Sequence, residues 1–156
     1  RDPFNRIALG YLAAVVCGLA LLLLHSTAQS GLPAAFVPQC PSPWELSKLA
    51  FWPLLAAWVL TGRLGRERRT LLQDLPAAVL TPLAMTAACW GLAAAGGNGA
   101  ASLAVWAVLL AAGTAFCPDG RKHPGLWAAL ALLLAGLYML LTFTPPGWGP
   151  FVNPLG

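Results

Sequence analysis

The chain has 156 residues, of which 58% are hydrophobic and only 9% are charged, and its formal net charge is +4. Soluble globular domains carry about 25% charged residues, so this composition excludes an ordinary soluble fold and predicts an integral membrane protein whose first partner is the lipid bilayer. The basic residues are not interleaved with aromatic residues, which excludes a nucleic-acid partner. In membrane proteins an excess of basic residues reflects which loops lie in the cytoplasm.

Residues 7–24 are the first predicted transmembrane helix. This apolar run follows Arg1 and Arg6 and therefore looks like the start of a secretion signal. It is longer than the roughly 7–15 apolar residues of a signal peptide, and it suits a spanning helix of about 20 residues better. We interpret it as a helix of the mature protein that ends at His25.

The next segment, residues 28–43, is an uncharged connection rich in proline. Its four prolines exclude a regular helix, and they are Pro33, Pro38, Pro41 and Pro43. The stretch L-P-A-A-F-V-P within it is too apolar for a solvated loop. We expect this connection to lie on the membrane surface or to tuck back against the helices, where non-helical backbone must be buried in protein.

Residues 44–61 are the second predicted span. Ser42 is a plausible N-cap, and Glu45 follows three residues later, as in a capping box. Pro53 interrupts this segment and predicts a kink in the helix.

Three further spans are predicted at residues 75–95, 100–116 and 125–142. Pro76 and Pro82 predict a kink in the first of them. The G-G-N-G sequence at 96–99 predicts a tight turn into the next span, and a charge-free tail follows residue 142.

The basic residues then determine the predicted orientation. Cytoplasmic loops of membrane proteins carry an excess of Lys and Arg. With the N-terminus in the cytoplasm, the outer face receives only Lys48, and the cytoplasmic face receives Arg1, Arg6, Arg63, Arg66, Arg68, Arg69, Arg121 and Lys122. The sequence therefore predicts one all-α domain, residues 1–156, with five transmembrane helices, a cytoplasmic N-terminus and an extracytoplasmic C-terminus.

The four cysteines predict neither disulfides nor a metal site. Cys17 and Cys89 fall in apolar spans, Cys117 falls in a basic loop, and Cys40 lies in the outer connection. No C-x-x-C or Cys/His spacing typical of metal ligands is present. We expect free thiols, no bound metal and no cofactor.

The polar residues of the outer face are predicted to converge on one candidate ligand-binding site, which comprises His25, Trp44, Glu45, Lys48, Trp148 and Asn153. Glu45 and Lys48 lie three residues apart on one helix face and are expected to pair. In a structural interpretation, Glu45 caps the helix, Lys48 snorkels to the interface, and Trp44 joins the interfacial aromatic belt. In a functional interpretation, the same residues line a pocket roofed by the connection and the tail, because ionisable groups within the membrane mark functional sites.

The segment from Pro38 to Pro53 also resembles a family hallmark. An uncharacterised family of small bacterial multi-span membrane proteins reads roughly Pro-Val-Asn-Glu-Ser-x-Trp-Glu-His-x-Lys, followed by apolar residues and a proline. The matching positions are Pro38, Ser42, Trp44, Glu45, Lys48 and Pro53, whereas Cys40, Pro41 and Leu46 replace the Asn, the first Glu and the His. The resemblance implies a divergent member, a multi-span fold and the bacterial cytoplasmic (inner) membrane, but it implies no known activity.

Three functions remain open from the sequence. The first is a non-enzymatic protein that binds or transports a small molecule or a lipid near Glu45 and Lys48. The second is a membrane-embedded enzyme that acts on a lipophilic substrate with Glu45 as general acid or base, although one carboxylate favours the non-enzymatic choice. The third is an accessory subunit of a larger membrane complex. For the first function, a homodimer would be a further way to build a transport pathway.

Overall fold

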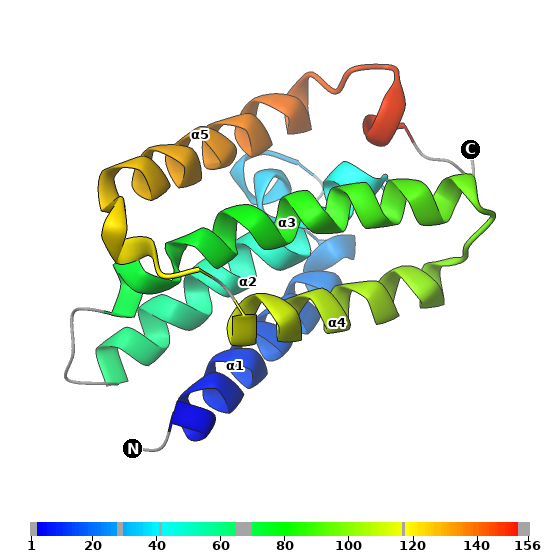
Figure 1. Ribbon diagram of the computed structural model, residues 1–156. Helices are drawn as coiled ribbons and strands as arrows, with labels where there is room; N and C mark the ends of the chain where they lie inside the picture. Colours follow the sequence, from blue (N-terminus) through cyan, green and yellow to red (C-terminus); the bar gives the residue numbers. More distant parts are fainter. Residues whose placement is uncertain (1–2, 28–29, 41, 65–69, 117, 153–156) are drawn as a thin grey trace.

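The computed structural model describes residues 3–27, 30–40, 42–64, 70–116 and 118–152, and this part of the chain is helical with no strand (Figure 1). The α-helices are α1 (Pro3–Leu23), α2 (Pro43–Leu64), α3 (Thr70–Ala94), α4 (Gly99–Phe116) and α5 (Pro124–Phe143). Short 3-10 turns are η1 (Leu24–Ser26), η2 (Leu32–Ala35), η3 (Gly120–Lys122) and η4 (Gly149–Phe151). The predicted all-α class is confirmed, and each predicted span falls on one of these helices.

Three helical segments are long and apolar enough to cross a membrane, which is fewer than the five that we expected. They are Asp74–Ala94 within α3, Gly99–Phe116 and Pro124–Phe143. The apolar part of α1, Ile7–Leu23, is shorter. Helix α2 is long enough, but its Glu45–Lys48 pair, its prolines and its tryptophans lower its mean hydropathy. The structure therefore supports a membrane protein with three helices that are long and apolar enough to cross the bilayer.

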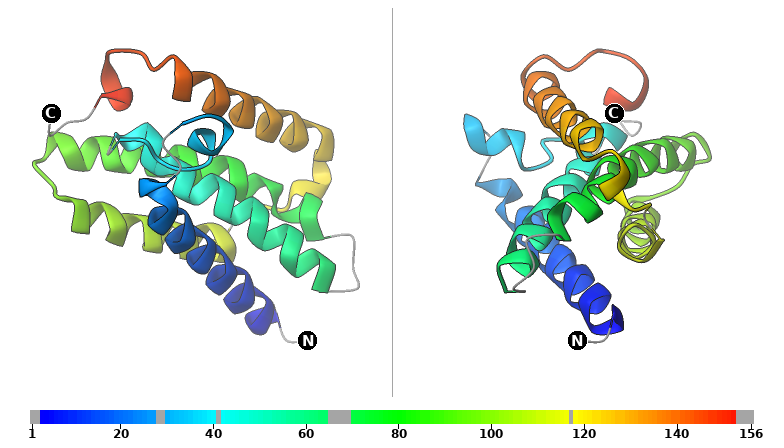
Figure 2. Two further views of the ribbon diagram at one scale, coloured as in Figure 1. Left: turned by 180° about the vertical axis from the view of Figure 1, so that it is seen from behind. Right: turned by 60° about the vertical axis from the view of Figure 1, so that its left-hand side comes forward.

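Helices α2 and α3 form the centre of the bundle (Figure 2). Helix α1 packs against α2 and α4, whereas α4 and α5 flank α3 on different sides. The main core lies among α1–α4 and includes Ala14, Leu54, Met85 and Leu110. The outer surfaces of α4 and α5 are apolar and exposed, for example at Leu132, as expected of surfaces that face lipid.

The helices alternate in direction. The start of α2, the turn between α3 and α4, and η4 lie at one end of the bundle. The end of α2, the start of α3, and η3 lie at the other end (Figures 1 and 2). We name the first of these the loop end, because residues 30–40 also lie there.

The predicted turn at 96–99 is confirmed. The Gly97 N–H donates to Leu92 O over 2.8 Å and the Gly96 N–H donates to Ala93 O over 3.1 Å, which is the Schellman pattern that ends many helices. Gly96 has a φ of 77°, a conformation that glycine adopts without steric cost. The Asn98 side chain then caps α4 by accepting the Ala101 N–H over 3.0 Å.

Helix α2 continues through Pro53 because another helix compensates for the missing hydrogen bond. A proline has no N–H, so Pro53 leaves the carbonyl of Leu49, four residues earlier, without its helical donor. The Trp106 indole of α4 donates to this carbonyl over 2.8 Å. Trp106 reaches it by packing over Gly18 of α1, where a Cβ would lie 2.5 Å from the indole ring. The predicted kinks at the prolines stay predictions.

Candidate functional site

The first turn of α2 carries the predicted cap. Ser42 Oγ accepts the Glu45 N–H over 3.2 Å, as the N-cap of a capping box does. In a complete capping box, the Glu45 carboxylate would also accept the backbone N–H of the N-cap residue, Ser42. It instead accepts the backbone N–H of Gln39 over 2.9 Å. The glutamate therefore connects the helix to the preceding loop.

The predicted Glu45–Lys48 pair is present and is buried. Lys48 Nζ lies 2.6 Å from Glu45 Oε2, and Lys48 is 0% exposed and Glu45 6% exposed. The ammonium also donates to Thr142 Oγ1 of α5 over 2.6 Å and to Ala34 O of the loop over 3.4 Å. These three acceptors match the three protons of an ammonium group. The prediction that Lys48 snorkels to the interface is wrong, because its partners hold it inside the bundle.

Residues 30–40 of the connection tuck back against the helices, which is one of the two arrangements that we expected. Ala34, Ala35 and Val37 are buried. The helices supply donors to the loop carbonyls: His25 Nδ1 lies 2.7 Å from Pro38 O, and the Trp52 indole donates to Ala35 O over 3.2 Å. Side chains thus satisfy backbone groups that neither a helix nor a sheet satisfies.

Aromatic side chains join α5 and the tail to the start of α2. The Trp44 ring lies 4.8 Å from the Tyr138 ring and 5.3 Å from the Phe151 ring, measured between centroids. The hydroxyl groups of Tyr138 and Ser47 lie 2.5 Å apart. Trp44 is 7% exposed and is therefore a core residue, not a member of an interfacial belt. Trp148 is 70% exposed and reaches this cluster only through the Phe151 ring.

A small cavity of about 70 Å³ lies beside the ion pair. It is lined by Gln39, Cys40, Ser42, Trp44, Glu45, Leu141, Thr142, Pro145 and Phe151. Two polar atoms of its lining residues have unused hydrogen-bonding capacity. Both hydrogen bonds that the Glu45 carboxylate accepts from described residues end on Oε2 and leave Oε1 available. The buried indole N–H of Trp44 has no hydrogen-bond partner in the described part of the chain.

The structure brings the predicted site residues together only in part. Trp44 and Glu45 line the cavity, and Lys48 lies directly behind Glu45. His25 binds the loop, and Trp148 lies at the edge of the aromatic cluster. Asn153 lies outside the described residues.

Sequence reasoning missed the residues of α5 that complete the site. Tyr138 and Thr142 are a lone phenol and a lone hydroxyl near the end of an apolar span, and they contact α2 residues more than 90 positions away. A four-residue spacing places both side chains on one helix face. This shared face is the signal that the sequence offered.

The chemical groups of the site are one carboxylate, one ammonium, the Cys40 thiol and several hydroxyl groups. No group of three or more His, Cys, Asp or Glu side chains that would hold a metal ion is found within the described ranges. Comparisons of the chain with protein-family models, with curated proteins and with solved structures find no match.

Proposed function

We propose that this protein binds a small, neutral, hydrogen-bonding group, from a small molecule or a lipid, in the cavity beside Glu45 and Lys48. The proposal includes five transmembrane helices in a bacterial cytoplasmic membrane, with the N-terminus inside and the loop end outside. The alternating helices and the positions of the basic residues support this topology. The hallmark at residues 38–53 supports membership, as a divergent member, of the uncharacterised family that it resembles.

One observation carries the proposed function. Two residues that line the cavity have a polar atom without a hydrogen-bond partner in the described part of the chain: Glu45 through Oε1 and Trp44 through its buried indole N–H. Buried polar groups are nearly always hydrogen-bonded, and those that are not require an explanation. A bound hydroxyl group would meet both needs, because it donates to a carboxylate and accepts from an indole N–H.

The charge and size of the cavity define the ligand class. Glu45 and Lys48 neutralise each other, so a second charged group would be buried without a counter-ion, which is strongly unfavourable. A volume of about 70 Å³ is far below the roughly 300–1,000 Å³ of ordinary ligand pockets. The group that enters is therefore small and neutral, such as an alcohol or one hydroxyl-bearing end of a larger molecule.

The surroundings of the ion pair favour binding over transport or catalysis. On the inner side of Lys48, helix α2 continues with Leu49, Phe51 and Leu54, all 0% exposed. These residues give no polar path across the bundle. Glu45 supplies the one carboxylate among the residues that line the cavity, which favours binding over general acid–base catalysis.

Chemical protection of Cys40 tests the proposal, since this thiol lines the cavity and is partly exposed. Purified protein in lipid nanodiscs is treated with methyl methanethiosulfonate while ethanol, ethanediol or glycerol is titrated, and modification of Cys40 is followed by mass spectrometry. We expect at least one of these alcohols to slow the modification in the wild type.

Two variants and one control make this test specific. Glu45→Gln and Trp44→Phe alter one lining group each and should reduce the protection. Asp119→Asn removes an exposed carboxylate near η3, at the other end of the bundle, and should behave like the wild type. Equal protection in all four proteins, or none in the wild type, would contradict the proposal.

A further inference from the structure

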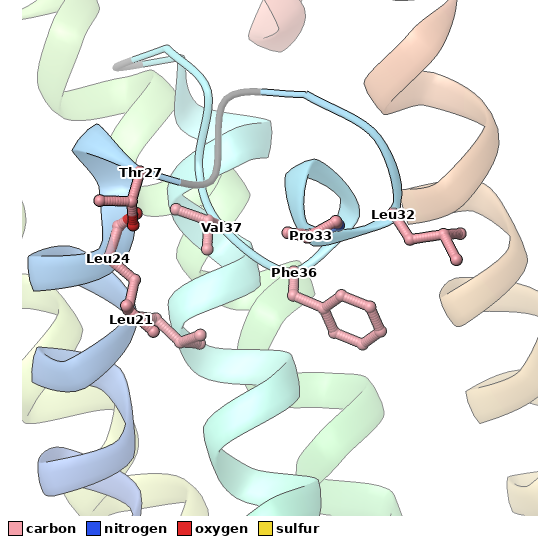
Figure 3. A pocket seen from close by; sticks show the side chains of 7 residues that line it. All are labelled: Leu21, Leu24, Thr27, Leu32, Pro33, Phe36 and Val37. Carbon is pink, nitrogen blue, oxygen red and sulfur yellow. The ribbon is translucent and has the colours of Figure 1, made fainter.

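A second, larger concavity lies on the outer side of the loop. This groove has a volume of about 480 Å³, within the 300–1,000 Å³ range typical of ligand sites. Residues from the end of α1 form one wall and residues of η2 and its C-terminal neighbours form the other, as Figure 3 shows. Thr27 contributes the one polar side chain of the lining, and the remaining lining residues are Leu21, Leu24, Leu32, Pro33, Phe36 and Val37.

The way the loop is anchored makes the groove apolar. The carbonyls of Ala34, Ala35 and Pro38 accept hydrogen bonds from side chains of the helices. The loop therefore presents its polar backbone to the bundle and leaves carbon on its outer surface. Leu32, which is 70% exposed, illustrates this arrangement.

We propose that the groove binds one acyl chain of a membrane lipid, at a site separate from the polar cavity beside Glu45. No charged side chain lines the groove, so a charged ligand would have no counter-ion there. A peptide segment would bring backbone N–H and C=O groups against an almost entirely carbon surface, which leaves them unsatisfied. A chain of methylene groups has neither requirement and removes apolar surface on both sides.

The position of the groove supports the same occupant. Leu21 belongs to the apolar part of α1, Ile7–Leu23, and the groove begins where this part ends. Leu19 and Leu23 of α1 are themselves 47% and 82% exposed, so the apolar surface continues from the helix into the groove. A lipid beside α1 can therefore place one chain in the groove while its other chain stays on the surface of the helix.

Photo-crosslinking tests this site with the full chain. The protein is reconstituted in phosphatidylcholine vesicles that contain a small fraction of phosphatidylcholine with a diazirine on one acyl chain, and crosslinked residues are mapped by mass spectrometry. We expect about tenfold more crosslinking per exposed apolar residue at positions 21–37 than on the outer faces of α4 and α5, a ratio equivalent to about 1.4 kcal/mol.

A matched pair of variants separates the site from ordinary lipid contact. Leu24→Trp adds bulk to the groove and should lower crosslinking at residues 32–37 several-fold. Leu132→Trp adds the same bulk to the exposed face of α5 and should leave crosslinking at residues 32–37 unchanged. Uniform crosslinking over all exposed apolar faces of the wild type would by itself overturn the proposal. Crosslinks from these positions to a second copy of the chain, in place of lipid, would also overturn it.

Discussion

Replacing Lys48 by methionine should severely destabilise the protein. The substitution removes the counter-ion 2.6 Å from Glu45 and leaves a carboxylate that is only 6% exposed. Breaking one side of a buried ion pair costs about 3–5 kcal/mol, since the remaining charge is buried without compensation. Folded domains are stable by about 5–15 kcal/mol, so this loss would remove a large part of the free energy of unfolding.

A double-mutant cycle distinguishes the charge from the volume of the side chain. The variant Glu45→Gln with Lys48→Met contains neither charge, and we expect it to recover about 2 kcal/mol relative to Lys48→Met alone, within the range found for residues in direct contact. Unfolding is titrated with SDS in mixed micelles and followed by near-ultraviolet circular dichroism. Lys122→Met, at an exposed position in η3, is the control and should leave the midpoint unchanged. A cost below about 1 kcal/mol for Lys48→Met, or a double variant at least as unstable as the sum of the single variants, would refute the reasoning.

Two further predictions concern the hydrogen bonds that replace regular backbone pairing. Trp106→Phe should cost about 1–3 kcal/mol, because the Leu49 carbonyl loses its donor. This cost should shrink in a Pro53→Ala background, where residue 53 regains an N–H for the same carbonyl, and an equal loss in both backgrounds in the SDS titration would contradict the explanation. His25→Ala should increase amide hydrogen exchange in the loop at residues 34–39 while exchange in α3 stays the same, because the His25 ring binds Pro38 O; unchanged exchange in the loop would show that this hydrogen bond does not anchor it.

The sequence by itself determined the features that depend on near neighbours. Apolar runs separated by proline, glycine and charged residues predicted the five α-helices, because helix formation depends on local periodicity and on end signals. The Ser42 cap, the turn after α3 and the Glu45–Lys48 pair were predicted for the same reason, since each joins residues no more than five positions apart.

Only the tertiary structure decided what the ion pair contacts and what surrounds it. Lys48 is buried because Thr142, 94 residues away, and Ala34, 14 residues away, supply its remaining acceptors. A helical sequence with a lysine near its start is equally consistent with an exposed ammonium, so the snorkelling prediction could not be decided locally. The cavity beside Glu45 likewise forms between the start of α2 and residues 141–151, which meet only when the bundle packs.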